Sequence, residues 1–158
     1  MEPEAYKTFF SLKKVYYPKF FAINLKGYVM KQNESFHIAV DKIPLNPKTG
    51  FNNLHGFGGI SIGYVAISTP TDLTPLFKGL PGNLCSSPHW GYILEGSIRV
   101  IYGNGKEETL RQGEVFYLPA PHTGIVDKSV KFIEFSPDEE FIPLMEHMEK
   151  KLKEQAAE

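Results

Sequence analysis

The residues best suited to chemistry in this sequence lie close together, in the stretch CSSPHWGYILEGSIRV at positions 85–100. The stretch contains the only cysteine and the only tryptophan of the chain, Cys85 and Trp90, and His89 precedes the tryptophan. Thiolate and imidazole groups are ligands of zinc and of other divalent transition metals. A lone cysteine is also a residue that proteins often bury as a small hydrophobe. The stretch therefore either binds something or packs into a core.

The sequence around this stretch predicts many short strands. Phe and Tyr are plentiful, and Pro and Gly are frequent enough to supply tight turns. Alternating apolar residues predict strands, and Gly-containing pairs such as Glu95-Gly96 and Gln112-Gly113 predict turns between them. Short strands at near-regular spacing are typical of an antiparallel β-sandwich or β-barrel. The predicted strands are 35–40, 60–68, 90–95, 97–102, 114–119, 122–126 and 130–135.

The remaining segments are predicted to be loop or helix. Residues 45–59 are rich in Asn, Gly and Pro and predict a long loop, and residues 3–14 predict a short helix. After the last strand, Ser136, Pro137 and Glu139 form a helix-start signal, and apolar residues then recur at helical spacing. Pro143 is expected to kink or restart this helix. We thus expect an N-terminal arm at 1–34, a barrel at 35–137 and an amphipathic helix at 138–158.

Composition limits the class of protein. The chain has 158 residues, which suits one domain. Its 17 Lys and Arg against 18 Asp and Glu give no basic excess, so no nucleic-acid partner is expected. No apolar run approaches the ~20 residues of a membrane span, and the first residues do not resemble a signal peptide. With a single cysteine there is no intramolecular disulfide, and we expect a cytoplasmic protein without a membrane partner.

Two segments resemble the sequence blocks of the cupin family. The turn YILEG at 92–96 is similar to the end of the first block, and Gly113, Pro119 and His122 follow the spacing of the second. The His-x-His pair of the first block would fall on Asn83 and Cys85, and Pro121 replaces a glycine of the second. The two segments also resemble a subgroup of small bacterial cupins without an assigned reaction. The resemblance implies a mainly β, antiparallel double-stranded β-helix (jelly-roll) barrel, with an altered metal-ligand set.

In the cupin arrangement, the strand that carries His122 lies next to the strand that begins at His89. The resemblance therefore implies a metal site made by Cys85, His89 and His122. Mixed sulfur and nitrogen ligands favour zinc first, with nickel or ferrous iron as alternatives. Three protein ligands leave a coordination position for water or substrate. His55, in the predicted loop, is a candidate fourth ligand or lid. Glu34, Asp41 and Glu134 could each supply a carboxylate, and their spacing does not choose among them.

The alternation of side chains along the strands predicts which residues line the pocket. His89, Gly91 and Ile93 are expected on one face of their strand, with Trp90 and Tyr92 on the other. A glycine at position 91 would leave open space beside the imidazole. Core packing would explain the same residues without a ligand. The predicted wall consists of Trp90, Gly91, Tyr92, Ile93, Phe116 and Tyr117.

Three functions are compatible with these observations. The first is a cupin-fold protein that binds a divalent metal and a small organic molecule in the barrel mouth, with or without catalysis. The second is a non-catalytic binding or sensing domain, in which the Cys85 thiol would respond to metal or oxidant. The third is a metal-free structural homodimer that pairs through its sheets, with the aromatic N-terminal arm as an interface or swapped segment. A homodimer is also expected under the first function.

Overall fold

The protein is described here from a computed structural model, which covers residue 35 and residues 37–43, 45, 50–55 and 57–155. The predicted N-terminal arm at 1–34, including the helix expected at 3–14, lies outside the described residues. Among the described helices, none is both long and apolar enough to cross a membrane.

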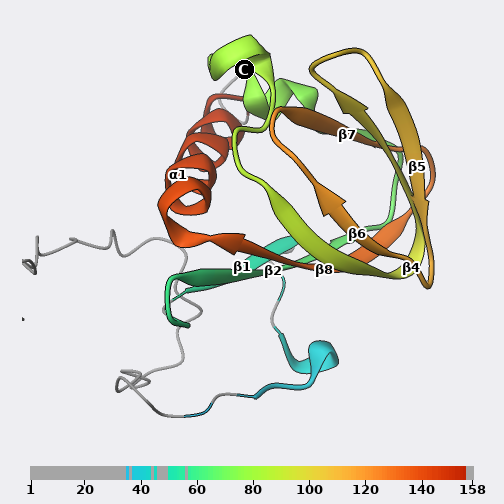
Figure 1. The fold of residues 1–158 in the computed structure, drawn as a ribbon, viewed down its shortest axis with the longest axis vertical. Coiled ribbons are helices and arrows are strands. Elements are labelled where there is room, and N and C mark those ends of the chain that lie inside the picture. Colours follow the sequence, from blue (N-terminus) through green and yellow to red (C-terminus); the bar gives the residue numbers. More distant parts are fainter. Residues whose placement is uncertain (1–34, 36, 44, 46–49, 56, 156–158) are drawn as a thin grey trace, which may run out of the picture.

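The described chain is mainly β, as predicted. Its strands hydrogen-bond into an antiparallel sheet that curls into a half-barrel, and a helix follows the last strand (Figure 1). The strand order is β1-β2-β8-β4-β7-β3, with β5 and β6 also paired to β4. The strands are β1 (Phe51–Leu54), β2 (Ile60–Ile67), β3 (Thr71–Asp72), β4 (His89–Tyr102), β5 (Glu107–Arg111), β6 (Val115–Leu118), β7 (His122–Val126) and β8 (Val130–Pro137).

Strand β4 joins the two halves of the curled sheet. Its first half pairs with β6 and β8, and its second half pairs with β5 and β7. The predicted turn at Glu95-Gly96 is a bend within this continuous strand. The register with β8 shifts between Ile93 and Glu95, and Gly96 has a φ of 71°, which favours glycine. The bend lets one strand serve both halves, so the prediction of two separate strands was wrong.

Two local predictions near the start of the described chain were also wrong. The described residues of the strand predicted at 35–40 form no strand: residues 37–39 have no regular structure, and η1 (Val40–Lys42) is a single 3-10 turn. Conversely, the loop predicted at 45–59 contains β1, which pairs with β2 so that Asn53 lies opposite Gly63. Asparagine disfavours strands in isolation, but pairing to β2 overrides that preference.

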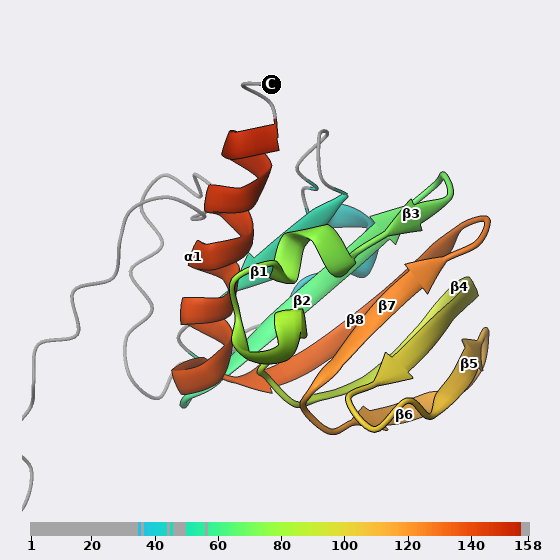
Figure 2. The same ribbon diagram turned by 90° about the horizontal axis from the view of Figure 1, so that it is seen from above.

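The helix α1 (Asp138–Gln155) begins directly after β8 and covers one end of the half-barrel (Figure 2). Acidic residues occupy its first turn, where their negative charges interact favourably with the positive end of the helix dipole. Pro143 lies inside the helix, which continues past it to Gln155. On the inner side, α1 adjoins η2 (Thr74–Phe77), a 3-10 turn, and its apolar residues join the main core. These core residues are Phe141, Leu144, Met145 and Met148.

Candidate metal centre and adjoining cavity

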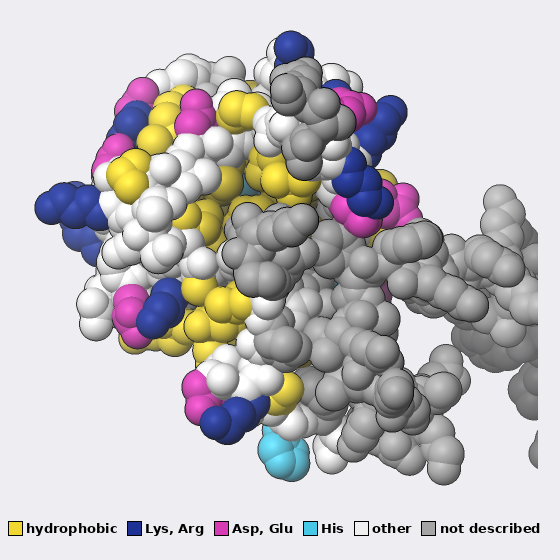
Figure 3. All heavy atoms as spheres, turned by 180° about the vertical axis from the view of Figure 1, so that it is seen from behind, with side chains coloured by type: hydrophobic (Ala, Val, Ile, Leu, Met, Phe, Trp, Pro, Cys, Tyr) yellow, Lys and Arg dark blue, Asp and Glu magenta, His cyan; other side chains and the backbone are white. Residues whose placement is uncertain are grey.

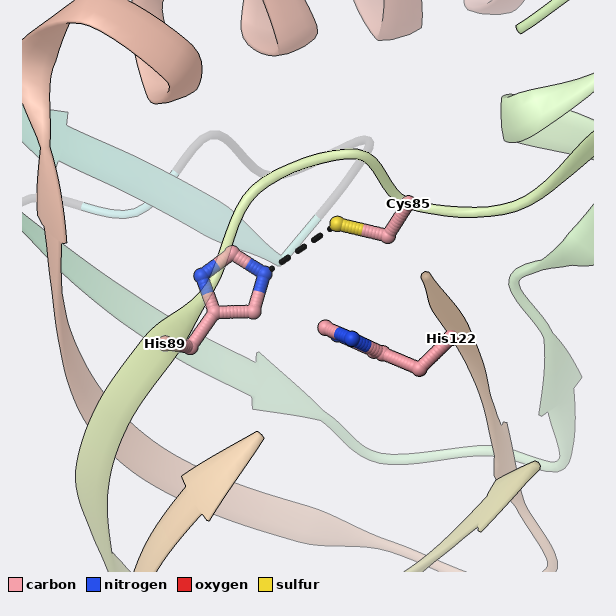
Figure 4. Close-up of side chains that lie close together, drawn as sticks. All are labelled: Cys85, His89 and His122. Carbon is pink, nitrogen blue, oxygen red and sulfur yellow. Dashed lines mark hydrogen bonds between the residues drawn. The ribbon is translucent and has the colours of Figure 1, made fainter. Parts of the chain in front are cut away.

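Cys85, His89 and His122 point toward one another inside the half-barrel (Figure 4). One potential ligand atom from each lies within 4.8 Å of the others, and the Cys85 sulfur is 3.2 Å from Nε2 of His89. All three side chains are buried, with exposed fractions of 1%, 6% and 5%. The structure thus brings together the three residues that the sequence predicted as ligands.

Backbone pairing accounts for this convergence. Cys85 and His122 form an antiparallel bridge, in which the Cys85 N–H donates to the His122 carbonyl at 2.7 Å and the reverse bond measures 3.3 Å. Residues paired in this way present their side chains on the same face of the sheet. His89 is the first residue of β4, four positions after Cys85, and its side chain enters the same interior. Two segments therefore supply all three groups.

Contacts at Nδ1 orient both imidazole rings. The Pro119 carbonyl can only accept, so Nδ1–H of His122 donates to it at 2.9 Å, and Nε2 of His122 keeps its lone pair. Nδ1 of His89 lies 2.7 Å from Oγ of Ser136, and Nε2 of His89 faces the Cys85 sulfur at 3.2 Å. Such supporting bonds are typical of histidines that bind metals. In both imidazoles the supporting contact is at Nδ1, which leaves Nε2 as the candidate ligand atom.

Burial keeps these groups uncharged. It lowers the pKa of His89 to about 4 and that of His122 to about 4, with His89 adding to the effect on His122. It raises the pKa of the Cys85 thiol to about 12. The imidazoles are therefore neutral at neutral pH, as metal binding requires, whereas the thiol would release its proton to a bound cation. The thiol is poorly suited to sensing an oxidant, since reactive cysteines are accessible thiolates.

The donor set fits a zinc-like ion. Tetrahedral zinc, with bonds of about 2.0–2.1 Å to nitrogen and about 2.3 Å to sulfur, holds its ligand atoms roughly 3.3–3.8 Å apart. The Cys85 sulfur and Nε2 of His89 are 3.2 Å apart, close to this spacing, and all three donor atoms lie within 4.8 Å of one another, so an ion would draw the more distant donors together by about 1.5 Å at most. One thiolate and two imidazoles together favour zinc over magnesium or calcium, which prefer oxygen ligands.

A cavity of about 80 Å³ adjoins the three residues, which form part of its wall. Most of the remaining wall is apolar and comes from the strands, from η2 and from α1. Three further polar side chains, Asn53 of β1, Thr123 of β7 and Glu134 of β8, also line it. The cavity therefore combines an apolar body, a candidate metal site and a second polar region.

Residue spacing alone did not distinguish Glu134 from the other candidate carboxylates. Glu134 is 9% exposed, and its Oε2 lies 3.8 Å from Nδ1 of His89, beyond hydrogen-bond range. Burial raises its pKa to about 8. Asp41, by contrast, is exposed and paired with Lys42, and Glu34 lies outside the described residues. Only the pairing of β8 with β2 and β4 identifies Glu134 as an interior residue.

The structure does not bring His55 to the three clustered residues. Its Nδ1 lies 2.8 Å from Oγ of Ser61, which in turn donates to Asp138 at the start of α1. His55 directly follows β1, and β2 and β8 separate β1 from β4. Three strand spacings of ~4.8 Å thus lie between His55 and His89. His55 contacts the start of the helix instead of completing the cluster.

None of the six residues predicted for the pocket wall lines this cavity. Trp90, Tyr92 and Tyr117 lie on the outer face of the sheet, with exposed fractions of 46%, 40% and 53%. Ile93 and Phe116 are buried in the core. The space expected beside Gly91 is filled, because a Cβ atom there would lie 2.3 Å from the Phe116 ring. Alternation assigned the faces of β4 correctly, but the core fills the inner face around Gly91.

Comparisons with known proteins yield structural neighbours only. No protein-family model and no curated protein matches the sequence. The cupin domain of Cnp3 from Schizosaccharomyces pombe is similar in structure, with a TM-score of 0.48 and 14% identity over 64% of this chain and 68% of that one. A protein of unknown function from Rhizobium leguminosarum has a TM-score of 0.48 and 17% identity, covering 66% and 96% of the two chains.

A third neighbour is an uncharacterised protein with a double-stranded β-helix domain from Klebsiella pneumoniae. Its TM-score is 0.47 and its identity 13%, over 66% of this chain and 90% of that one. At this level of similarity the neighbours carry no argument about the site, whose chemistry has to be inferred from the residues themselves.

Proposed function

We propose that this protein binds one divalent transition-metal ion, zinc first, through Cys85, His89 and His122, and holds a small organic molecule in the adjoining cavity. The observation that carries the proposal is the convergence of three buried donor atoms within 4.8 Å, with both imidazoles oriented by bonds at Nδ1. When bound, such an ion supplies a Lewis acid.

The cavity supports the second part of the proposal. The three candidate ligands belong to its wall, so a ligand in the cavity would lie beside the ion. A largely apolar cavity with a few polar groups is the usual form of a small-molecule site. In this arrangement Ser136 and Pro119 orient the imidazoles, and the apolar side chains of α1 keep water away from the cluster.

A specific observation favours a metal-free binding domain as the second candidate. The Cys85 thiol and Nε2 of His89 already satisfy each other at 3.2 Å, so the pair is also stable as part of a polar core. In that case the cavity would bind its ligand without an ion, and the histidines would serve to shape the interior.

Metal analysis separates the two candidates. The full chain is purified without chelator and without a metal column, and its metal content is measured by mass spectrometry. Chelator-treated protein is then titrated with zinc by calorimetry. We expect about one ion per chain, and binding weakened by more than about a hundredfold in His89→Gln and His122→Gln. His37→Gln, at an exposed histidine, is the matched control and should bind as the wild type does.

The variants also need a readout that does not depend on metal affinity alone. Zinc should raise the melting temperature of the wild type and of His37→Gln, because a ligand that binds only the folded state stabilises it. It should not raise that of His122→Gln. A folded wild type that takes up no zinc, or a His89→Gln variant with full occupancy, would overturn the metal proposal and favour the second candidate.

A further inference from the structure

The cavity has a second polar region, formed by Asn53 and Glu134, that the candidate metal centre does not use. Asn53 is 4% exposed, and its Nδ2 has no hydrogen-bond partner although it is buried. An unpartnered buried N–H group costs free energy, and such groups are rare in folded proteins. Since Asn53 lines the cavity, a molecule inside the cavity is the natural source of the missing acceptor.

The pairing register of β1, β2 and β8 places Glu134 on the same interior face of the sheet as Asn53. Asn53 pairs with Gly63 of β2, and Gly63 pairs with Glu134 of β8, so the three form one row across adjacent strands. Gly63 has no side chain, and the Glu134 side chain leans over it. A Cβ atom on Gly63 would lie 2.7 Å from Cγ and 2.8 Å from Oε1 of Glu134. Glu134 therefore extends from its own strand toward the strand of Asn53.

The two carboxyl oxygens of Glu134 face different groups. Oε2 is on the side of His89, whereas Oε1 lies over Gly63, between β8 and β1. In either protonation state the carboxyl group has lone pairs that can accept a hydrogen bond. The polar region thus offers a donor at Asn53 and an acceptor at Glu134. A hydroxyl group is complementary to both, because its oxygen accepts one bond while its hydrogen makes another.

We propose that Asn53 and Glu134 bind the hydroxyl group of a small, mainly apolar alcohol whose carbon chain occupies the rest of the cavity. The volume of about 80 Å³ is roughly half that of the ~150 Å³ cavity known to hold benzene, so the alcohol has about three to five non-hydrogen atoms. The proposal rests on the proposed function in one respect only: both require a small molecule in this cavity.

The test compares two isomers of equal size, n-butanol and methyl propyl ether, which lacks the O–H donor. Each is titrated into chelator-treated, isotopically labelled full-length protein, and binding is followed by backbone amide shifts. We expect n-butanol to bind about five- to tenfold more tightly than the ether, the equivalent of one hydrogen bond. In Glu134→Leu, which removes the acceptor that only the O–H of the alcohol can use, this preference should shrink to about twofold or less, whereas Asn53→Leu should weaken the binding of both isomers.

A matched variant controls for general effects on the cavity. Thr123 also lines it, but its hydroxyl already bonds to that of Thr74 at 3.0 Å, so Thr123→Val should keep the preference for the alcohol. Asn53→Leu should also unfold at a higher urea concentration than the wild type, since it removes an unpartnered buried donor. This second readout is independent of ligand binding.

The outcomes distinguish this proposal from the metal proposal. Equal binding of the two isomers, a preference unchanged in Glu134→Leu, or binding of both isomers unchanged in Asn53→Leu would overturn the hydroxyl site. So would the absence of binding by either isomer, which would leave only water at Asn53. Each of these results leaves the zinc titration unaffected. Conversely, alcohol binding in protein that takes up no zinc would support the hydroxyl site while the metal proposal fails.

Discussion

Burial acts on each titratable residue of the candidate site in the direction that removes charge. The pKa of His89 and that of His122 fall to about 4, while burial raises the pKa of Glu134 to about 8. The interior is therefore neutral around these groups when no cation is present. A bound divalent ion would reverse the preference at Cys85 by favouring its thiolate.

The same shifts predict how stability depends on pH in metal-free protein. Between pH 6.5 and about 4, both histidines are protonated in the unfolded chain but not in the folded protein. As the pH falls through this range, each histidine therefore lowers the free energy of unfolding by about 1.4 kcal/mol per pH unit. Glu134 has the opposite effect between pH 4.5 and about 8, where its carboxyl group is ionised only in the unfolded chain: its contribution to the free energy of unfolding rises as the pH falls. The net effect is a stability maximum near pH 6.5.

Urea unfolding at a series of pH values, with chelator present, measures this profile. In His122→Gln, the remaining contributions of His89 and Glu134 nearly cancel between pH 4.5 and 6.5, so the acid side should become almost flat. An acid side as steep in His122→Gln as in the wild type would show that His122 is not held neutral by the fold.

Not all of the site could be predicted from single residues. Cys85, His89 and His122 stood out because they are rare and because their spacing resembles that of cupin blocks. Glu134 and Asn53 carry no such signal. Their position depends on the pairing of β1, β2 and β8, which brings together residues some 80 positions apart in the sequence.

At the scale of elements, periodicity predicted most strands and the C-terminal helix, and failed where partners outweigh local preference. Strand β1 contains two asparagines, yet its pairing with β2 makes it a strand with all four residues buried. The stretch at 35–40 alternates well, but its described residues form no strand. Strand β4 continues through a turn-like pair because Gly96 permits the bend between the two halves of the sheet.

This role of Gly96 makes a prediction about stability. Gly96 and Gly105 both have positive φ, at 71° and 82°, but a Cβ atom on Gly96 would lie 2.1 Å from the Ser129 carbonyl oxygen, whereas one on Gly105 meets nothing within 4 Å. Gly105→Ala should cost about 1 kcal/mol of backbone strain. Gly96→Ala should cost about 3 kcal/mol or more, since it adds a steric clash to the strain. Equal losses in urea unfolding would contradict a bend that depends on Gly96.

At the scale of the whole molecule, the outer face of the sheet carries exposed apolar side chains. Trp90 stacks on Tyr117 with ring centroids 4.9 Å apart, and Phe135 lies beside Trp90 on the neighbouring strand. Tyr92 and Val115 are a second exposed pair on β4 and β6. Figure 3 shows that Lys and Arg stand next to Asp and Glu on the side opposite to that of Figure 1, with hydrophobic side chains between them.

The homodimer expected from the sequence remains a prediction, and this outer face is where we expect it to form. Trp90→Ser should weaken self-association by about tenfold or more, because buried Trp and Tyr residues supply much of the binding free energy at interfaces. Sedimentation velocity over a range of concentrations measures the effect, with Glu146→Ala, at an exposed position on α1, as the control. A wild type that is monomeric at every concentration would show that the sheet face does not pair.

The central claim is that one thiolate and two imidazoles bind a single ion, and cobalt(II) substitution tests it most directly. Chelator-treated protein is loaded with one equivalent of cobalt(II), and its absorption spectrum is compared with those of Cys85→Ser and His37→Gln. We predict an intense near-ultraviolet thiolate-to-cobalt band in the wild type and in His37→Gln, and its loss in Cys85→Ser. A weak spectrum of hydrated cobalt, unchanged between the wild type and Cys85→Ser, would contradict the claim.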